Sequence, residues 1–167
     1  MTVQQVEVAY GATIQSVAEI IGIPSVVGGM TNYVALVSGI ITRESGGNPN
    51  AIGDNGCSYG LMQLNTCAGW LPGFGPGQDN SMLLDPTTNI NYGCQYLNTL
   101  LNQYQNVAQA ISAYNAGSPT TANAGYVSAV LGYIKQLGGF ITSNPLILAA
   151  GVGVLAVLAI SSARGAK

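Results

Sequence analysis

Charged side chains are scarce in this chain of 167 residues: only 6% are Asp, Glu, Lys or Arg, against about a quarter in a typical globular protein. Fourteen Asn and ten Gln supply polarity instead. The net charge of −2 is too small to attract a polyanion, so we expect no nucleic-acid partner. The scarcity of charge predicts a surface covered by neighbouring subunits or by lipid. An amide-rich surface in contact with water is the alternative.

Histidine is absent, which excludes histidine-based catalytic triads and histidine metal sites. The three cysteines, Cys57, Cys67 and Cys94, lack the spacing of zinc ligands and permit at most one intramolecular disulfide. We therefore expect no metal and no cofactor. A candidate disulfide joins Cys57 to Cys67, where it would brace the segment around Gln63 in an oxidising compartment. Buried free thiols are the alternative.

A secretory leader is also missing from the sequence as given. Residues 1–12 have neither the basic start nor the apolar core of a signal peptide, and we expect them to form a separate N-terminal segment. If the protein works outside the cytoplasm, we expect another route to carry it there. The length suits one domain of ordinary size followed by a tail.

The chain does contain a helical stripe that ends in an acid. Its members recur at i, i+4, i+7 and i+11: Tyr33, Val37, Ile40 and Glu44. Gly46 and Gly47 then end the helix. Desolvation by the apolar face and the negative end of the helix dipole both favour a protonated Glu44 carboxyl, which suits a general acid near neutral pH. The alternative is that Glu44 only ends a core helix and points into solvent.

The first half of the chain also predicts a short helix and a turn-rich segment. Apolar residues at helical spacing indicate a helix over residues 13–22, which the Pro and Gly residues within 23–29 separate from the Glu44 helix. The Gly, Asn and Pro residues of 48–60 indicate turns and a small β-ribbon. Residues 71–80 are expected to form a surface loop.

The second half predicts three more helices. Asp85 as N-cap and Pro86 at the first helical position begin a helix that runs through Tyr104. Gly93 lies on its apolar face, which indicates the close approach of another backbone. Two further helices are expected over residues 107–117 and 126–134. The body is therefore expected to be mainly α-helical.

An unbroken apolar run occupies residues 146–160. As a helix it would be about 22 Å long at roughly 1.5 Å per residue, which is short of the approximately 30 Å hydrocarbon core of a membrane. We expect an apolar helix over residues 140–163 that anchors the protein in a membrane, followed by a basic tail at 164–167. A helix buried in a protein assembly is the alternative.

Four short motifs occur in a fixed order along the chain. They are E-S at 44–45, G-L-M-Q at 60–63, N-I-x-x-G-x-x-Y-L at 89–97 and A-Y-N-A-G at 113–117. In this order and at these spacings, the set resembles the soluble lytic transglycosylase domain, a relative of goose-type lysozyme. The resemblance covers roughly residues 13–135. It implies a mainly α, lysozyme-like α+β domain over residues 13–139, with a small β-ribbon.

The resemblance also assigns roles to residues. Glu44 matches the family's sole catalytic acid/base, and Tyr114 matches a tyrosine that hydrogen-bonds near the catalytic carboxyl. Met62 matches an apolar wall of the glycan cleft. Together, the residues implied to contact the substrate are Ser45, Met62, Gln63, Tyr114 and Asn115.

The carboxylates fit the reaction of this family. Most glycosidases need two acids that flank the scissile bond, and here Asp85 caps a helix while Asp79 lies in a glycine-rich loop. Asp54 remains as the one candidate for a second acid. The resemblance implies that Glu44 alone protonates the bond between N-acetylmuramic acid and N-acetylglucosamine, and that a 1,6-anhydro ring then closes in place of attack by water. Hydrolysis of the same bond, as in a lysozyme, is the alternative.

The sequence also departs from the usual family pattern. Asn65-Thr66 replaces a common Met-Pro pair, residues 23–32 form a longer connection than usual, and charge is unusually low. With no leader, few charges and an apolar tail, the chain resembles the small transglycosylases carried in bacteriophage particles. This resemblance implies a virion-associated or membrane-anchored enzyme that opens peptidoglycan in the bacterial periplasm or cell envelope as the genome enters. A component of a secretion or conjugation apparatus is one alternative. A structural or pore-forming protein with a weakly active, glycan-binding domain is another.

Overall fold

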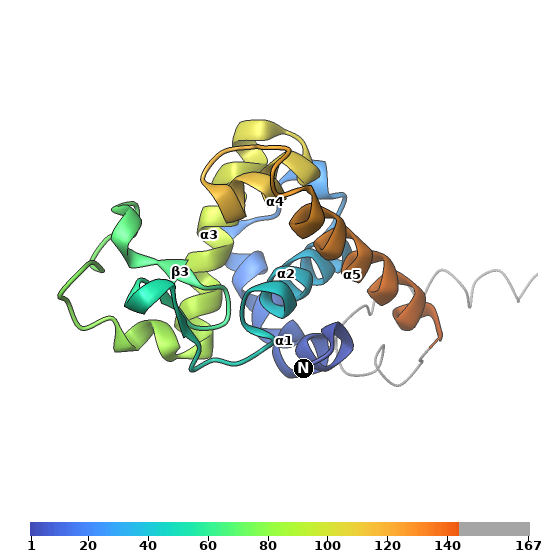
Figure 1. Cartoon of the computed structure of the whole chain (residues 1–167). Helices are drawn as coiled ribbons and strands as arrows, with labels where there is room; N and C mark the ends of the chain where they lie inside the picture. The colour runs from blue at the N-terminus through green and yellow to red at the C-terminus, as the bar shows by residue number, and fades with distance from the viewer. Residues whose placement is uncertain (144–167) are drawn as a thin grey trace, which may run out of the picture.

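The structure, a computed structural model, describes residues 1–143 and is mainly helical within them (Figure 1). Helix α2 packs between α1 and α5, and α3 packs against α1 and α4. The segment between α2 and α3 projects from this helical body as a turn-rich lobe (Figure 1). The α-helices are α1 (Val3–Ile21), α2 (Met30–Ser45), α3 (Pro86–Tyr104), α4 (Val107–Ala116) and α5 (Ala124–Ser143). The prediction of a mainly α fold is confirmed.

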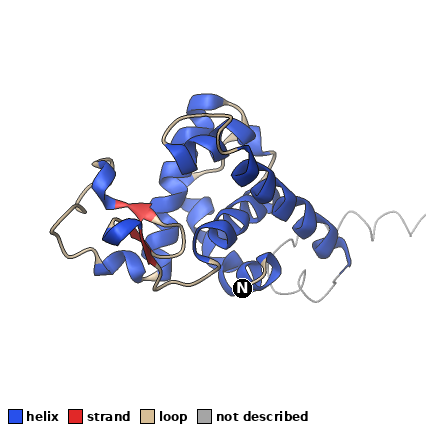
Figure 2. Ribbon diagram, in the orientation of Figure 1, coloured by secondary structure: helices blue, strands red, loops and turns tan. Residues whose placement is uncertain are grey.

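A three-stranded antiparallel sheet lies in the turn-rich lobe (Figure 2). Its strands are β1 (Ile52–Gly53), β2 (Ser58–Tyr59) and β3 (Leu64–Asn65), in that order. Ile52 pairs with Tyr59, and Ser58 pairs with Asn65. Each strand has only two residues. The same segment between α2 and α3 also contains three short 3₁₀ helices, η2 (Asp54–Gly56), η3 (Thr66–Ala68) and η4 (Ser81–Leu84), whereas a fourth, η1 (Ser25–Val27), lies between α1 and α2. The small β-ribbon expected from the turn residues is confirmed.

Helix α1 begins ten residues earlier than the predicted start at residue 13. Thr2 and Gln5 form a capping box at its N-terminus, and Val6 is fully buried. The predicted start was wrong because a buried acid, Glu7, interrupts the apolar pattern. Glu7 is 1% exposed, its carboxyl oxygens have no hydrogen-bond partner among the described residues, and burial raises its pKa to about 7. The division into domains at residues 12 and 139 stays a prediction.

The apolar stripe of α2 is buried as predicted: Tyr33, Val37 and Ile40 are all 0% exposed. A Cβ atom at Gly39 would lie 3.3 Å from the carbonyl oxygen of Val130, so α2 and α5 approach closely there. Packing on both sides thus fixes the direction of α2 and the position of the residues at its C-terminus.

The α3 glycine that was expected to face another backbone faces a side chain instead. A Cβ atom at Gly93 would collide with Sδ of Met62. The sequence correctly indicated a close approach on this face of α3, but a thioether rather than a main chain fills the space.

The predicted C-terminal anchor is not described by the structure. Helix α5 runs without a break through Ser143, across the expected boundary at residue 139, whereas the apolar run 146–160 lies outside the described residues. Within residues 1–143, none of the helices has both the length and the apolar character that crossing a membrane requires.

Asn89 on α3 joins the helical body to the lobe. Its side chain is 0% exposed; Oδ1 accepts a hydrogen bond from the Met62 amide at 2.8 Å. Its Nδ2 donates to the carbonyls of Tyr59 at 2.9 Å and Leu83 at 2.8 Å. One amide therefore satisfies three buried backbone groups of the lobe.

Replacing Asn89 by Ala would leave those three backbone groups without partners. We expect Asn89→Ala to lower the free energy of unfolding by about 3 kcal/mol or more, since each unsatisfied buried group costs roughly 1–3 kcal/mol. Urea unfolding followed by circular dichroism measures the change. Asn102→Ala, on the exposed side of the same helix, is the matched control. A loss at Asn89 no larger than the loss at Asn102 would contradict this account.

Candidate active site

Glu44 lies in the last turn of α2. The helix ends at Gly46, whose φ of 62° suits the left-handed C-cap. The Tyr126 hydroxyl, from the first turns of α5, donates a hydrogen bond to Oε1 of Glu44. The guanidinium carbon of Arg43 lies 5.8 Å from the centre of the Tyr126 ring. The acid is thus held where α2 ends and α5 begins.

The pKa of Glu44 is raised above the ordinary value of a glutamic acid. Burial is the main cause, because it penalises the charged form. The hydrogen bond from Tyr126 and the positive charge of Arg43 lower the pKa, and the negative charge of Asp54 raises it. The net direction favours a protonated carboxyl, as a general acid near neutral pH requires.

Glu44 faces a cavity of about 370 Å³. A second cavity of about 510 Å³ shares four lining residues with the first, so the two form one cleft. The residues that line both are Gln63, Asn65, Tyr114 and Asn115. Asp54 and Ser58 join Glu44 in the first cavity, while Trp70 and Tyr96 line the second. We name this combined space the Glu44 cleft.

Aromatic rings follow the Glu44 cleft away from the acid. Trp70 stacks on Tyr96 with ring centres 4.1 Å apart, and Tyr96 lies 5.4 Å from Tyr114 at a tilted angle. Such faces suit the apolar sides of sugar rings.

Gln63 lies at the junction of the two cavities. Its backbone has a φ of 47°, and its Nε2 donates to the carbonyls of Gly60 at 2.9 Å and Ala51 at 3.2 Å. A Cβ atom at Gly53 would collide with the Gln63 side chain. The amide is therefore fixed by its own turn before any ligand arrives.

Tyr114 lines the same cavity as Glu44, and its predicted role near the catalytic carboxyl stays a prediction. Its hydroxyl donates to the Met62 carbonyl at 2.9 Å and so holds the G-L-M-Q segment against α4.

Tyr126 is the residue that contacts the acid directly, and the sequence reasoning missed this role. Tyr126 is 8% exposed and shares its helix face with Val130, so its pattern was that of an ordinary core residue. Its place at the start of a helix was the available signal.

Two predicted substrate contacts do not lie in the cleft. The Ser45 hydroxyl donates to the Ile41 carbonyl at 3.3 Å and accepts the Gly47 amide at 3.2 Å, so it supports the helix end. Met62 is 0% exposed, and its side chain packs against α3. The Met62 side chain is therefore not among the residues that line the Glu44 cleft, and its predicted contact with the glycan stays a prediction. Its backbone hydrogen-bonds with Asn89 and Tyr114.

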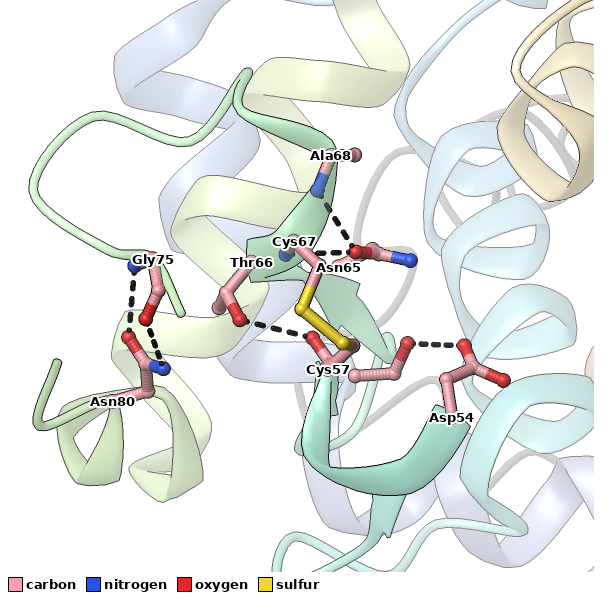
Figure 3. Close-up of a disulfide and its surroundings, with 9 residues drawn as sticks. Asp54, Cys57, Asn65, Thr66, Cys67, Ala68, Gly75 and Asn80 are labelled. Carbon is pink, nitrogen blue, oxygen red and sulfur yellow. Dashed lines mark hydrogen bonds between the residues drawn. A yellow bond between two sulfur atoms is a disulfide. The ribbon is translucent and has the colours of Figure 1, made fainter. Parts of the chain in front are cut away.

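A disulfide joins Cys57 to Cys67 across the lobe (Figure 3). Beside it, the Thr66 hydroxyl donates to the Cys57 carbonyl at 3.1 Å. Oδ1 of Asn65 accepts the amides of Cys67 and Ala68. The ring that this bridge closes includes Ser58, Gln63 and Asn65, so a covalent link braces one wall of the cleft. Cys94 is a buried free thiol.

Comparisons of the sequence and of the fold with known proteins identify a family and two relatives. The model of the transglycosylase SLT domain family matches residues 31–129, more than half of the chain. A protein named transglycosylase from Enterobacteria phage PRD1 is 35% identical over 83 residues, which are 50% of this chain and 29% of that protein. The 70 kDa soluble lytic transglycosylase SLT70 from Escherichia coli has a similar structure, with 26% identity and a TM-score of 0.61. That similarity covers 79% of this chain and 24% of the larger one. The chain thus spans less than a third of either relative.

Replacing Tyr126 by Phe would remove the hydrogen bond to the Glu44 carboxylate and keep the ring. Because that bond stabilises the charged form, we expect Tyr126→Phe to raise the pKa of Glu44 further. Carbon-13 NMR of side-chain-labelled glutamate measures it, since the chain has only three glutamates. Tyr133→Phe, on the same helix, is the control. An unchanged or lower pKa in Tyr126→Phe would contradict the assignment.

Proposed function

Because the chain belongs to the transglycosylase SLT domain family, we propose that it is a lytic transglycosylase of peptidoglycan. In this proposal it cleaves the β-1,4 bond between N-acetylmuramic acid and N-acetylglucosamine. The observation that carries the proposal is the Glu44 carboxyl, partly buried at the end of α2, bound by Tyr126 and facing a cleft.

The proposed reaction uses Glu44 first as an acid and then as a base. The protonated carboxyl gives its proton to the glycosidic oxygen, the bond from that oxygen to C1 of the muramyl sugar breaks, and N-acetylglucosamine leaves with a free hydroxyl. The muramyl acetamido group supports the positive charge on C1. The Glu44 carboxylate then takes the proton of the 6-hydroxyl, whose oxygen bonds to C1 and closes the 1,6-anhydro ring. Glu44 ends protonated, and no water is consumed.

The residues around the acid have supporting roles in this proposal. Tyr126 orients the carboxyl, and its hydroxyl stabilises the charged form that exists between the two proton transfers. Gln63 and Asn115 contact the glycan from opposite walls of the cleft. The aromatic faces of Trp70 and Tyr96 bind a sugar farther along the strand. The reaction needs no metal and no cofactor.

Hydrolysis of the same bond is the second candidate, favoured by one observation. Asp54 lines the same cavity as Glu44, and a second carboxylate near the bond is what a hydrolase uses to activate water. The two candidates differ only in the group that attacks C1, so their products distinguish them.

The context that we propose is a bacteriophage particle, in which the enzyme opens the cell wall locally as the genome enters. The relative from Enterobacteria phage PRD1 supports this context. In this proposal the protein is virion-associated, its substrate partners are glycan strands in the cell envelope, and other virion proteins are its neighbours. A component of a secretion apparatus remains the alternative context.

We expect Glu44→Gln to lower the rate of peptidoglycan cleavage by a factor on the order of 10² to 10⁴, because a neutral amide is far too weak an acid to protonate the glycosidic oxygen. Zymography on purified cell-wall sacculi and the initial rate of release of soluble fragments measure the loss. Glu19→Gln is the control, since Glu19 is exposed on α1 and accepts a hydrogen bond from Gln15 of the same helix. Equal activity in both variants would refute the assignment. No activity even in the wild type would favour a glycan-binding, structural role.

The mass of the released fragments provides a separate prediction. We expect muropeptides that end in a 1,6-anhydro ring, which are lighter by one water than the hydrolysed products. Liquid chromatography with mass spectrometry distinguishes them, and digestion of the same sacculi by a hydrolytic lysozyme is the control. Products with only reducing ends would reassign the protein as a hydrolase.

A further inference from the structure

A second carboxylate faces Glu44 from the other wall of its cavity. Asp54 belongs to η2 in the turn-rich lobe, whereas Glu44 belongs to α2, yet both line the same space of about 370 Å³. Helix end and lobe therefore each contribute one acid to the cavity.

The Asp54 carboxylate is held in place by a buried hydroxyl. The Ser58 hydroxyl donates to Oδ2 of Asp54 at 2.5 Å, and Ser58 is only 2% exposed. Ser58 lies on β2, which pairs with both other strands, and it follows Cys57 of the disulfide directly. The orientation of this carboxylate is thus fixed by a buried residue of the central strand, next to the disulfide.

The backbone at Asp54 gives further support. Asp54 and Asn55 have φ angles of 50° and 54°, so two successive residues other than glycine adopt the left-handed conformation. Asp and Asn tolerate it best, but at some cost in free energy. Glycine would fit the turn without that cost, and it would leave the cavity without a carboxylate.

The positions of these groups point to a role for Asp54 in the reaction, an inference that rests on the function proposed above. We propose that Asp54, oriented by Ser58, stabilises the positive charge that develops on the muramyl sugar as the glycosidic bond breaks. Ser58 occupies Oδ2, and Oδ1 is the oxygen that we assign to the substrate. A preorganised negative charge of this kind lowers the barrier because it is already in place when the sugar becomes positive.

Asp54 also interacts electrostatically with Glu44. Its negative charge is one cause of the raised pKa of Glu44, after burial and alongside the opposing effects of Tyr126 on α5 and Arg43 on α2. On α4, burial is the main cause of the raised pKa of Tyr114, and the negative charge of Glu44 raises it further. Removing the charge of Asp54 is therefore expected to lower the pKa of Glu44, which a change in turn structure alone would not do.

Asp54→Asn tests the charge with little change in shape. Asn tolerates the left-handed turn, and its side-chain oxygen still accepts the Ser58 hydroxyl. Using the full chain and soluble glycan strands, we expect kcat to fall roughly 10- to 100-fold, with KM changed by less than about threefold. The basic limb of the pH profile of kcat is expected to move to lower pH, because Glu44 then loses its proton at lower pH. Asp79→Asn, in the exposed loop, is the control with unchanged kcat.

Ser58→Ala tests the orientation separately. It leaves the Asp54 carboxylate but removes its buried donor, so we expect a smaller fall in kcat than for Asp54→Asn. If Ser58 acts through Asp54, the double variant will be no slower than Asp54→Asn alone. Thermal unfolding of each variant identifies any loss of folding, and Ser58→Ala keeps the test valid if Asp54→Asn does not fold.

Two results would overturn the proposal. One is an Asp54→Asn variant with the kcat and pH profile of the wild type. The other is an Asp54→Asn variant that still releases anhydro products at the wild-type rate but no longer releases products with reducing ends. That result would make Asp54 a base that activates water. Failure of the proposed function is distinguishable from both, because then either the wild type would be inactive or Glu44→Gln would keep the activity of the wild type. An inactive Glu44→Gln beside a fully active Asp54→Asn would reject the role of Asp54 alone.

Discussion

The hydrogen bond between the Tyr126 hydroxyl and the Glu44 carboxyl is the contact on which this site depends. It joins residues that are 82 positions apart in the chain, so it forms only when α2 and α5 pack correctly. That packing comes from the core: the buried face of α2 lies against α5 at Gly39, where no larger residue fits comfortably. The position of the reactive proton is thus a result of helix packing, and the cleft is built around it.

Hydrogen bonds and a disulfide, rather than apolar packing, hold the opposite wall of the cleft in place. Strands of two residues cannot support a wall by themselves. The lobe relies instead on the Asn89 amide, on the Tyr114 hydroxyl at the Met62 carbonyl and on one disulfide. Apolar packing positions the acid, and polar side chains together with a covalent link position the groups that face it.

Much of this arrangement could be predicted from the sequence, because it follows from local pattern. Residues close together in the sequence predict the apolar stripe of α2, the helix cap at Asp85 and the turns of the β-ribbon. The family resemblance on four motifs is confirmed by the match to the SLT domain. The failures share one cause: a pattern gives the face of a helix but not what meets that face. Tyr126 had the pattern of a core residue, and the buried acid Glu7 interrupted the apolar pattern of the first half of α1.

Helix α1 has a consequence for any attempt to dissect the protein. The family match begins at residue 31, after α1 has ended, yet Val6, Ile14 and Val17 belong to the same core as the stripe of α2. A fragment limited to residues 31–129 would lack α1 and would expose one side of the apolar stripe of α2 to solvent. The part of the chain that we expect to fold by itself is therefore longer than residues 31–129, because the core needs the buried face of α1 to cover the stripe of α2.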